Sequence, residues 1–292
     1  MTRIASRDLL LLLGITIIWG LNLVISKFGL AHLPPLLFTV LRFAVVAVAL
    51  LPFLRWYDGQ MGSLVVAGLL SGGVCFALMF IGLSMAENVA AVAIAGQLGV
   101  PFTTLLSVAL LGEVVHWRRW TGIGMSFLGI LVMGLDPEVF RDWRSLALVI
   151  GSAFVGALGL IAVKRLRAVD PIAMQCWFAL VSLPLLLAIS LPFEQPTFAM
   201  FAAAPWSAWA ALLFSALGAS VIAQTGFYYL VQRYPVTSVA PLTVLSPVLS
   251  VVFSVWLLGN ELTPRLVVGG VLTLAGVFII VWRERRIVEV GT

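Results

Sequence analysis

The sequence is a succession of apolar runs of about twenty residues, which is the length that a helix needs to cross the hydrocarbon core of a bilayer. Short segments that carry charges, prolines or glycines separate the runs. Ten runs meet the criterion, at 8–30, 34–54, 62–84, 88–111, 119–135, 145–164, 171–191, 205–230, 236–258 and 264–282. No segment of domain size remains between them, so we expect an all-α integral membrane protein with ten transmembrane helices.

The composition agrees with this expectation, because 62% of the residues are hydrophobic and only 10% are charged. Soluble domains carry about 45–50% apolar and about 25% charged residues. The excess of basic residues is scattered between the apolar runs, which excludes a nucleic-acid-binding patch. The first run continues to Leu30 without a small-residue cleavage site, so we expect an uncleaved first span.

The distribution of basic residues predicts the orientation. With the N-terminus placed in the cytoplasm, twelve Lys and Arg residues fall on the cytoplasmic side, and only Arg141, Arg144 and Arg265 fall on the other. Cytoplasmic loops of membrane proteins are enriched in Lys and Arg. We therefore expect a multi-pass protein of the cytoplasmic (inner) membrane with both termini in the cytoplasm.

A repeat relates the two halves of the chain. The group formed by Leu111-Gly112-Glu113, Gly122 and Gly129 recurs about 147 residues later as Leu258-Gly259-Asn260-Glu261, Gly269 and Gly276. Pro101 matches Pro247 within one residue of this offset, and Pro35 matches Pro171 at an offset of 136. A unit of five spans enters the membrane from the opposite side when it is duplicated, so we expect two inverted five-helix repeats, at 1–140 and 141–292. Inverted repeats are typical of secondary transporters.

Glycine and proline interrupt the fourth and ninth runs at corresponding positions, at Gly96 to Pro101 and at Pro241 to Pro247. A proline removes an amide donor, and an open backbone group is tolerated in lipid only beside a cavity, water or another helix. One interpretation is that both interruptions line a substrate cavity; the other is that the prolines only kink packed helices. Paired interruptions favour the cavity.

Polar side chains at similar depth complete a candidate site. The candidate substrate-binding residues are Trp19, Asn22, Gln97, Pro101, Gln224, Tyr228, Thr243, Ser246 and Arg42. The buried amides are equally consistent with hydrogen bonds between helices. Arg42 has the depth to bind a substrate carboxylate or, alternatively, helix-end carbonyls, whereas Lys27 is close enough to its helix end to reach the interface.

The twelve acidic residues all lie outside the middle of the spans, and His32 and His116 lie in loops. The sequence therefore indicates no catalytic residue, no metal site, no cofactor and no proton relay, and we do not expect an enzyme.

These residues resemble one transporter family. Trp19-Gly20-Leu21-Asn22 with Lys27, Pro34-Pro35 followed by Leu41-Arg42-Phe43, and the two Pro-to-Leu-Gly-Glu segments are similar to the EamA branch of the drug/metabolite transporter (DMT) superfamily. The size and the aromatic first half look similar to amino-acid exporters of the YddG type. The resemblance implies a secondary transporter that exports small neutral metabolites, with amino acids, including aromatic ones, as the first expectation.

The function expected from the sequence is export by alternating access around a cavity bounded by spans 1, 3, 4, 6, 8 and 9, as an uncoupled facilitator. The alternatives are an exporter of amphipathic drugs or lipid-linked metabolites and, in a different class, a solute channel or membrane scaffold. The expected partners are a small-molecule substrate and membrane lipid, without nucleic acid, and the chain is expected to act as a monomer, with a dimer as the alternative.

Overall fold

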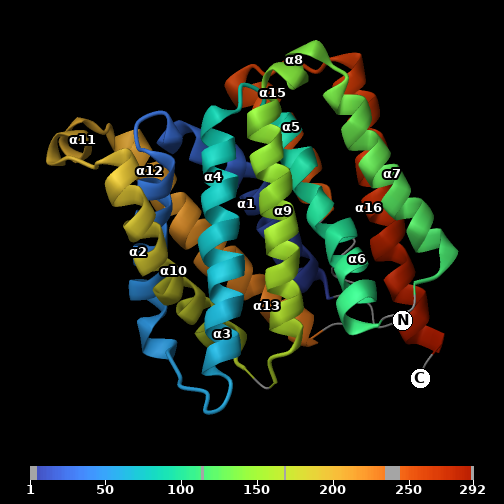
Figure 1. Ribbon diagram of the computed structural model, residues 1–292, viewed down its shortest axis with the longest axis horizontal. Coiled ribbons are helices and arrows are strands. Elements are labelled where there is room, and N and C mark those ends of the chain that lie inside the picture. The colour runs from blue at the N-terminus through green and yellow to red at the C-terminus, as the bar shows by residue number, and fades with distance from the viewer. Residues whose placement is uncertain (1–4, 113–114, 168, 234–243, 291–292) are drawn as a thin grey trace.

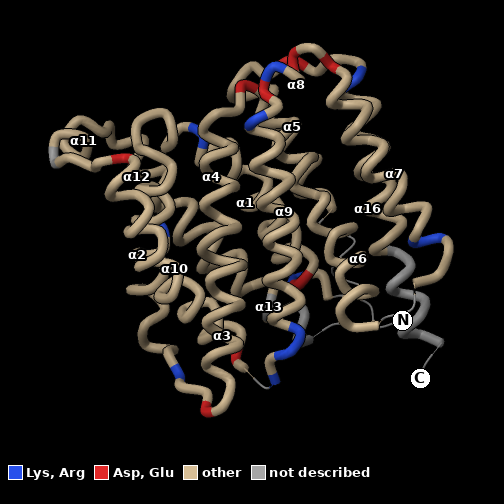
Figure 2. Tube along the Cα trace, viewed as in Figure 1, with Lys and Arg blue, Asp and Glu red and all other residues tan. Residues whose placement is uncertain are grey.

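The computed structural model describes residues 5–112, 115–167, 169–233 and 244–290, and these segments form helices joined by short connections. The long helices lie side by side in one bundle, and α1 begins at the same end of the bundle at which α16 ends, opposite the short helix α8 (Figure 1). Most Lys, Arg, Asp and Glu residues lie at the two ends of this bundle (Figure 2). Apolar side chains fill the length between them, as a bilayer requires.

The helices follow the order expected from the sequence. In the first half they are α1 (Ser6–Leu30), α2 (Pro35–Leu50), α3 (Met61–Gly68), α4 (Cys75–Met85), α5 (Val89–Ala95), α6 (Gly99–Leu111) and α7 (Trp117–Gly134). After α8 (Pro137–Arg141) come α9 (Trp143–Lys164), α10 (Pro171–Glu194), α11 (Phe198–Ala203), α12 (Trp206–Leu213), α13 (Gln224–Arg233), α15 (Leu245–Leu258) and α16 (Pro264–Val290).

Eight segments of the described chain are long and apolar enough to cross a membrane, which confirms an all-helical, multi-pass membrane protein. The other two predicted spans correspond to α7, whose first turn contains Arg118 and Arg119, and to α15. The predicted run 236–258 begins outside the described residues, so α15 is only its second part.

The repeat is visible where α7 packs against α16. A Cβ atom added to Gly122 would lie 2.8 Å from the carbonyl oxygen of Gly276, and one added to Gly269 would lie 2.5 Å from that of Gly129. Gly122 and Gly269 are repeat counterparts, and so are Gly129 and Gly276, so each contact is the image of the other. The backbones approach this closely because the contact positions carry no side chain. This reciprocal packing is what a two-fold axis between antiparallel counterpart helices produces.

The fourth span is broken where the sequence predicts an interruption. Helix α5 ends at Ala95, a 3₁₀ turn covers Gly96–Leu98, and α6 begins at Gly99. Pro101 is the third residue of α6, and its counterpart Pro247 is the third residue of α15. Both prolines therefore lie in a first helical turn, where the amide has no partner within the helix, rather than in the middle of a continuous helix.

The third span of each half contains a feature that hydropathy does not predict. A π-helical segment joins α3 to α4 at Leu69–Val74, and another joins α12 to α13 at Phe214–Ala223. Segments of this kind occur frequently at functional sites because they widen the helix and change the direction of its side chains. Both segments border the cavity that is described below.

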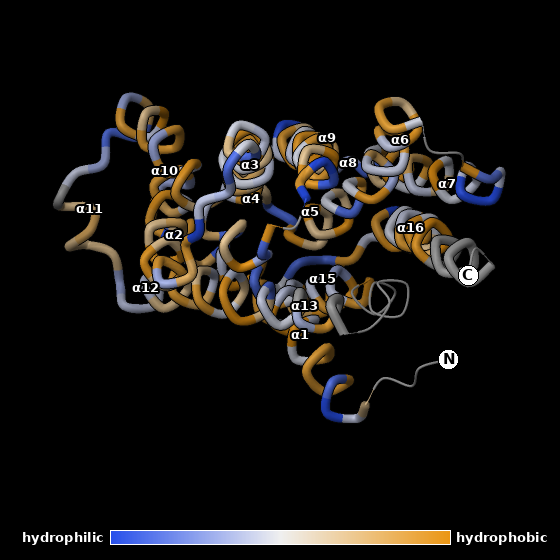
Figure 3. Tube along the Cα trace, turned by 90° about the horizontal axis from the view of Figure 1, so that it is seen from below, coloured by the Kyte–Doolittle hydropathy of each residue, from blue (hydrophilic) through white to orange (hydrophobic). Residues whose placement is uncertain are grey.

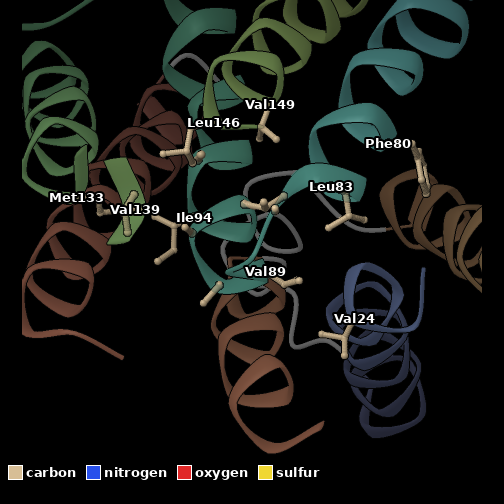
Figure 4. Packing of buried hydrophobic residues seen from close by; sticks show 14 of the residues in the cluster. Val24, Phe80, Leu83, Val89, Ile94, Met133, Val139, Leu146 and Val149 are labelled. Atoms are coloured by element: carbon tan, nitrogen blue, oxygen red, sulfur yellow. The ribbon is translucent and has the colours of Figure 1, made fainter. Parts of the chain in front are cut away.

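The largest buried cluster surrounds α5, all of whose residues are buried. Figure 4 shows Val89 and Ile94 of α5 among Val24 of α1, Leu83 of α4 and Val149 of α9. This packing joins the two halves near the α8 end of the bundle. Seen from the opposite end, α9 and α13 lie on opposite sides of the molecule (Figure 3).

Candidate functional site

A cavity of about 590 Å³ lies between the two halves. It is bordered by α1, α2, α4, α9, α10, α13 and both π-helical segments. Its lining residues are Trp19, Asn22, Leu23, Arg42, Phe43, Ser71, Gly72, Phe76, Met79, Phe80, Gly156, Leu160, Val163, Met174, Gln175, Phe178, Ala219, Ser220 and Gln224. This size is typical of sites for small molecules, which combine apolar walls with a few polar groups.

Arg42 is the charged group of this cavity, although its side chain is only 4% exposed. Its Nε and Nη2 atoms donate hydrogen bonds to the hydroxyl of Ser220, at 3.2 and 2.8 Å. Its Nη1 atom is buried and has no hydrogen-bond partner in the part of the chain that the structure describes. The described residues that line the cavity include no Asp or Glu. Among them, the guanidinium therefore keeps a positive charge without a counter-ion and one unused donor.

Aromatic rings hold Arg42 from the other side. Its guanidinium carbon lies 4.7 Å from the ring centroid of Phe76 and 5.3 Å from that of Phe80. Phe43 meets Phe76 edge to face at 5.3 Å, and Phe178 adds a further ring to the lining. Cation–π contacts stabilise a buried guanidinium without neutralising it. The guanidinium of Arg42 is therefore a positive charge within an apolar, aromatic wall of the cavity.

Helix α1 contributes two of the predicted residues. The indole Nε1 atom of Trp19 donates to the carbonyl oxygen of Ala219 in the second π-helical segment, at 3.3 Å, and its ring lies 5.3 Å from that of Phe227. Asn22 lies one turn further along α1, and its Oδ1 atom is buried without a partner among the described residues. Both side chains line the cavity, as does Gln224 at the start of α13.

Gln175 belongs to the same cavity but is absent from the residues predicted from the sequence. Its Nε2 atom donates to the carbonyl oxygen of Ser220, while its Oε1 atom is buried without a partner within the described segments. An isolated amide in the apolar run 171–191 is the signal that would have identified it, since a buried amide must face the interior of a bundle.

The structure does not bring all predicted residues together. Trp19, Asn22, Arg42 and Gln224 line the cavity, whereas Gln97, Pro101 and Ser246 are not among its lining residues. Thr243 lies outside the described residues, as does Pro241, and the side chain of Tyr228 is not described either. The cavity thus lies against spans 2 and 7 in addition to spans 1, 3, 6 and 8.

A second cavity of about 440 Å³ adjoins the first, and the two share Met79, Gly156 and Leu160. It lies between α4, α6, α7, α9 and α16, and its lining includes Gly96, the first residue of the 3₁₀ turn of the fourth span, and Gly99, the residue that follows this turn. The predicted interruption of that span therefore borders this second cavity rather than the one that contains Arg42.

Polar contacts close the bundle at the α8 end. The Nζ atom of Lys27 donates to the carbonyl oxygens of Leu83, Ser84 and Ala86 at the end of α4, at 2.9, 2.9 and 2.6 Å. Both carboxylate oxygens of Glu194 accept from the first amides of α2, each at 2.7 Å. These charged groups satisfy helix-end atoms that would otherwise be open.

Two asparagines join the two halves of the chain at the same end of the bundle. The Nδ2 atom of Asn88 donates to the carbonyl of Glu261 at 3.1 Å, and the Nδ2 atom of Asn260 donates to the carbonyl of Glu87 at 3.0 Å. The cavity, by contrast, extends toward the opposite end, because Val163 and Met174 line it near the end of α9 and the start of α10.

Comparison with known proteins gives relatives along the whole chain. The "Probable amino-acid metabolite efflux pump" of Escherichia coli is 28% identical over 298 residues, covering 99% of this chain and 100% of that protein. The protein of the same name in Salmonella typhimurium is 29% identical, with 98% and 99% covered. The "Probable terminal-alkyne amino-acid exporter" of Streptantibioticus cattleyicolor is 31% identical over 184 residues, 61% of this chain and 59% of that protein.

The fold has a counterpart among solved structures. A crystal structure that covers 97% of this chain and 99% of its own superposes with a TM-score of 0.65 at 20% identity, which shows a shared fold. Residues 7–135 and 143–282 each match the EamA-like transporter family, so each half of the chain carries one copy of the family's repeat. This double match supports the ten-helix DMT fold and makes the protein a transporter rather than an enzyme. The chain is therefore a member of the EamA-like transporter family, within the DMT superfamily.

Proposed function

We propose that this transporter exports neutral amino acids, including aromatic ones, by alternating access of the cavity that contains Arg42. Within the predicted set, Trp19, Asn22, Arg42 and Gln224 are the proposed substrate contacts. The names of the relatives from E. coli and S. typhimurium refer to amino-acid metabolites, which supports the same class of substrate.

The observation that carries the proposal is the Nη1 donor of Arg42, which has no partner among the described residues, in a cavity whose described lining contains no carboxylate. A buried cation without a counter-ion is costly, and a ligand that supplies the negative charge removes that cost. Arginine is well suited to carboxylates because its planar guanidinium offers several donors. The aromatic wall around Phe76 and Phe178 provides an apolar surface for the side chain of the substrate.

We propose that movement is uncoupled and follows the substrate gradient. The part of the cavity lining that the structure describes contains no Asp, Glu or His that could carry a proton between the two faces. A zwitterion also carries no net charge, so the membrane potential does no direct work on it. The basic residues of the loops favour cytoplasmic termini, which would open the cavity toward the cytoplasm in this conformation.

A competition panel tests the proposal. Liposomes that contain the purified protein are loaded with unlabelled phenylalanine. Saturable counterflow of labelled phenylalanine from outside is then measured in the presence of external competitors. We expect neutral amino acids to compete and lysine, glutamate and an amphipathic quaternary amine to compete poorly. Competition by the amine alone would favour a drug exporter, and a flux without saturation or counterflow would indicate a channel.

A pH gradient tests the uncoupled mechanism separately. Liposomes that hold equal phenylalanine on both sides should show no net accumulation when a pH gradient is imposed. Accumulation against the phenylalanine gradient, with protons moving alongside, would show that transport is coupled.

A further inference from the structure

We propose that Gln175, together with Asn22, forms a subsite for the ammonium group of the substrate, so that the transporter selects molecules that carry a primary amine beside a carboxylate. This inference rests on the proposed function, in which Arg42 binds the carboxylate of the substrate. It assigns the residues that bind the ammonium group in the same cavity. It starts from two amide oxygens, Gln175 Oε1 and Asn22 Oδ1, which are both buried in the cavity lining and have no hydrogen-bond partner among the described residues.

The orientation of the Gln175 amide follows from its hydrogen bond. Only the NH₂ group of an amide can donate to a carbonyl, and Gln175 donates to the carbonyl oxygen of Ser220. Its oxygen is therefore the atom that remains without a partner. A buried acceptor without a donor is costly, so a ligand that supplies an N–H group gains free energy at this position.

Ser220 places this acceptor beside Arg42. Its hydroxyl accepts from Nε and Nη2 of Arg42, and its carbonyl accepts from Gln175. One residue therefore anchors both the side chain with the unused donor, Arg42, and the side chain with the unused acceptor, Gln175. We infer that this pair binds the carboxylate and the ammonium group of an α-amino acid, which are bonded to the same carbon.

The uncharged nature of these acceptors is part of the selectivity. A carboxylate at position 175 would pair with Arg42 and neutralise the group that binds the substrate carboxylate. An amide accepts from the ammonium group and leaves the positive charge of Arg42 available. A carboxylic acid without the amine would leave both amide oxygens unpaired, and sites built to bind an N–H group discriminate strongly against ligands that lack it.

The test compares ligands that share a phenyl ring and differ only in whether they carry the amine and the carboxylate. Binding of labelled phenylalanine to the purified full-length protein is measured in competition with phenylalanine, 3-phenylpropanoate, which lacks the amine, and phenethylamine, which lacks the carboxylate. We expect each analogue to compete at least about tenfold more weakly than phenylalanine, since hydrogen bonds to charged groups contribute at that level. The wild-type comparison needs no variant, so it tests the subsite whether or not any variant folds.

Variants then test whether Gln175 is the residue that causes the preference for phenylalanine over 3-phenylpropanoate. Gln175→Leu should reduce the ratio of phenylalanine to 3-phenylpropanoate affinity about tenfold and leave the ratio of phenylalanine to phenethylamine affinity high. Gln60→Leu is the matched control, because Gln60 is an amide outside the cavity lining whose Nε2 atom donates to the carbonyl of Arg167 and whose Oε1 atom accepts from the amide of Arg167. We expect this control to keep the ratio to 3-phenylpropanoate, whatever its effect on overall affinity.

The outcomes separate the two proposals. If 3-phenylpropanoate competes as well as phenylalanine with the wild-type protein, or if Gln175→Leu folds and keeps the wild-type ratio, the ammonium subsite at Gln175 is wrong and amino-acid binding stands. If neither phenylalanine nor 3-phenylpropanoate binds, the proposed function itself fails, and the subsite fails with it.

Discussion

Ser126 of α7 and Thr273 of α16 donate to each other's main-chain carbonyl, at 3.4 and 3.3 Å, and are separated by 147 residues, the offset of the repeat. Each residue is therefore bonded to its own counterpart. A residue can pair with its own counterpart only near the axis that relates the two halves. The two hydroxyls therefore lie near the two-fold axis that relates the two halves of the transporter.

The packing around this pair should be sensitive to small substitutions. A Cβ atom at Gly129 would collide with Thr273, so Gly129→Ala should lower the free energy of unfolding by about 2 kcal/mol and the unfolding midpoint by several degrees. Gly124→Ala in the same helix is the control, because its Cβ atom would meet open space. Thermal unfolding in detergent measures both variants, and equal midpoints would contradict the account of the α7 and α16 contact.

The stability of the α8 end should depend on acid pH through Asp136. Hydrogen bonds, first from Thr263 and then from the amide of Glu138, hold the pKa of the Asp136 carboxyl below its ordinary value. A lowered pKa in the folded state stabilises the protein above the unfolded value of about 3.9, and this contribution is lost as the pH falls through the folded value. Asp136→Asn should therefore flatten the decline of the unfolding midpoint below about pH 4. A decline identical to that of the wild-type protein would exclude this role.

The hydrogen bonds of Lys27 should help to keep the α8 end of the bundle closed. Its ammonium group holds three carbonyls at the end of α4, so Lys27→Met should leave these acceptors open and shift the population toward the state open at the α8 end. Spin labels at Ala31 and Met85 would then report longer distances, whereas Lys27→Arg should retain most of the closed state. An unchanged distance distribution in Lys27→Met would show that this contact does not hold the end closed.

The orientation is testable by chemical labelling. In a background without Cys75 and Cys176, an impermeant thiol reagent added outside intact cells should modify Arg141→Cys and spare Arg118→Cys, because α8 and the start of α7 lie at opposite ends of the bundle. The reversed labelling pattern would place the termini outside the cytoplasm.

The sequence predicts the spans and the repeat because both depend on local properties. Hydropathy and length locate the helices to within a few residues, and the interruption before Pro101 is present as a 3₁₀ turn. The cavity depends on contacts between distant residues, and this is why only part of the candidate site follows from sequence. The Arg42 contact with Ser220 spans 178 residues, and the π-helical segments that shape the cavity have no hydropathy signal.

The role of Gln97 shows the same limit. Its position beside Pro101 indicates a polar, interrupted helix, but the sequence does not specify which neighbouring helix that turn faces. The structure places the flanking Gly96 and Gly99 at the second cavity. Substrate contact by Gln97, Pro101 and Ser246 therefore stays a prediction.

The most direct test of the central proposal is the affinity for phenylalanine after the charge of Arg42 is removed. Counterflow of labelled phenylalanine is measured in liposomes for the wild-type protein, Arg42→Gln and Arg265→Gln, in which the replaced arginine donates to the carbonyl of Leu135 at an exposed site. We predict that Arg42→Gln weakens the apparent affinity at least about tenfold, since a charge-assisted hydrogen bond is lost, while Arg265→Gln behaves as the wild-type protein. A folded, inserted Arg42→Gln protein with wild-type affinity and rate would contradict the proposal that this cavity binds the carboxylate of the substrate.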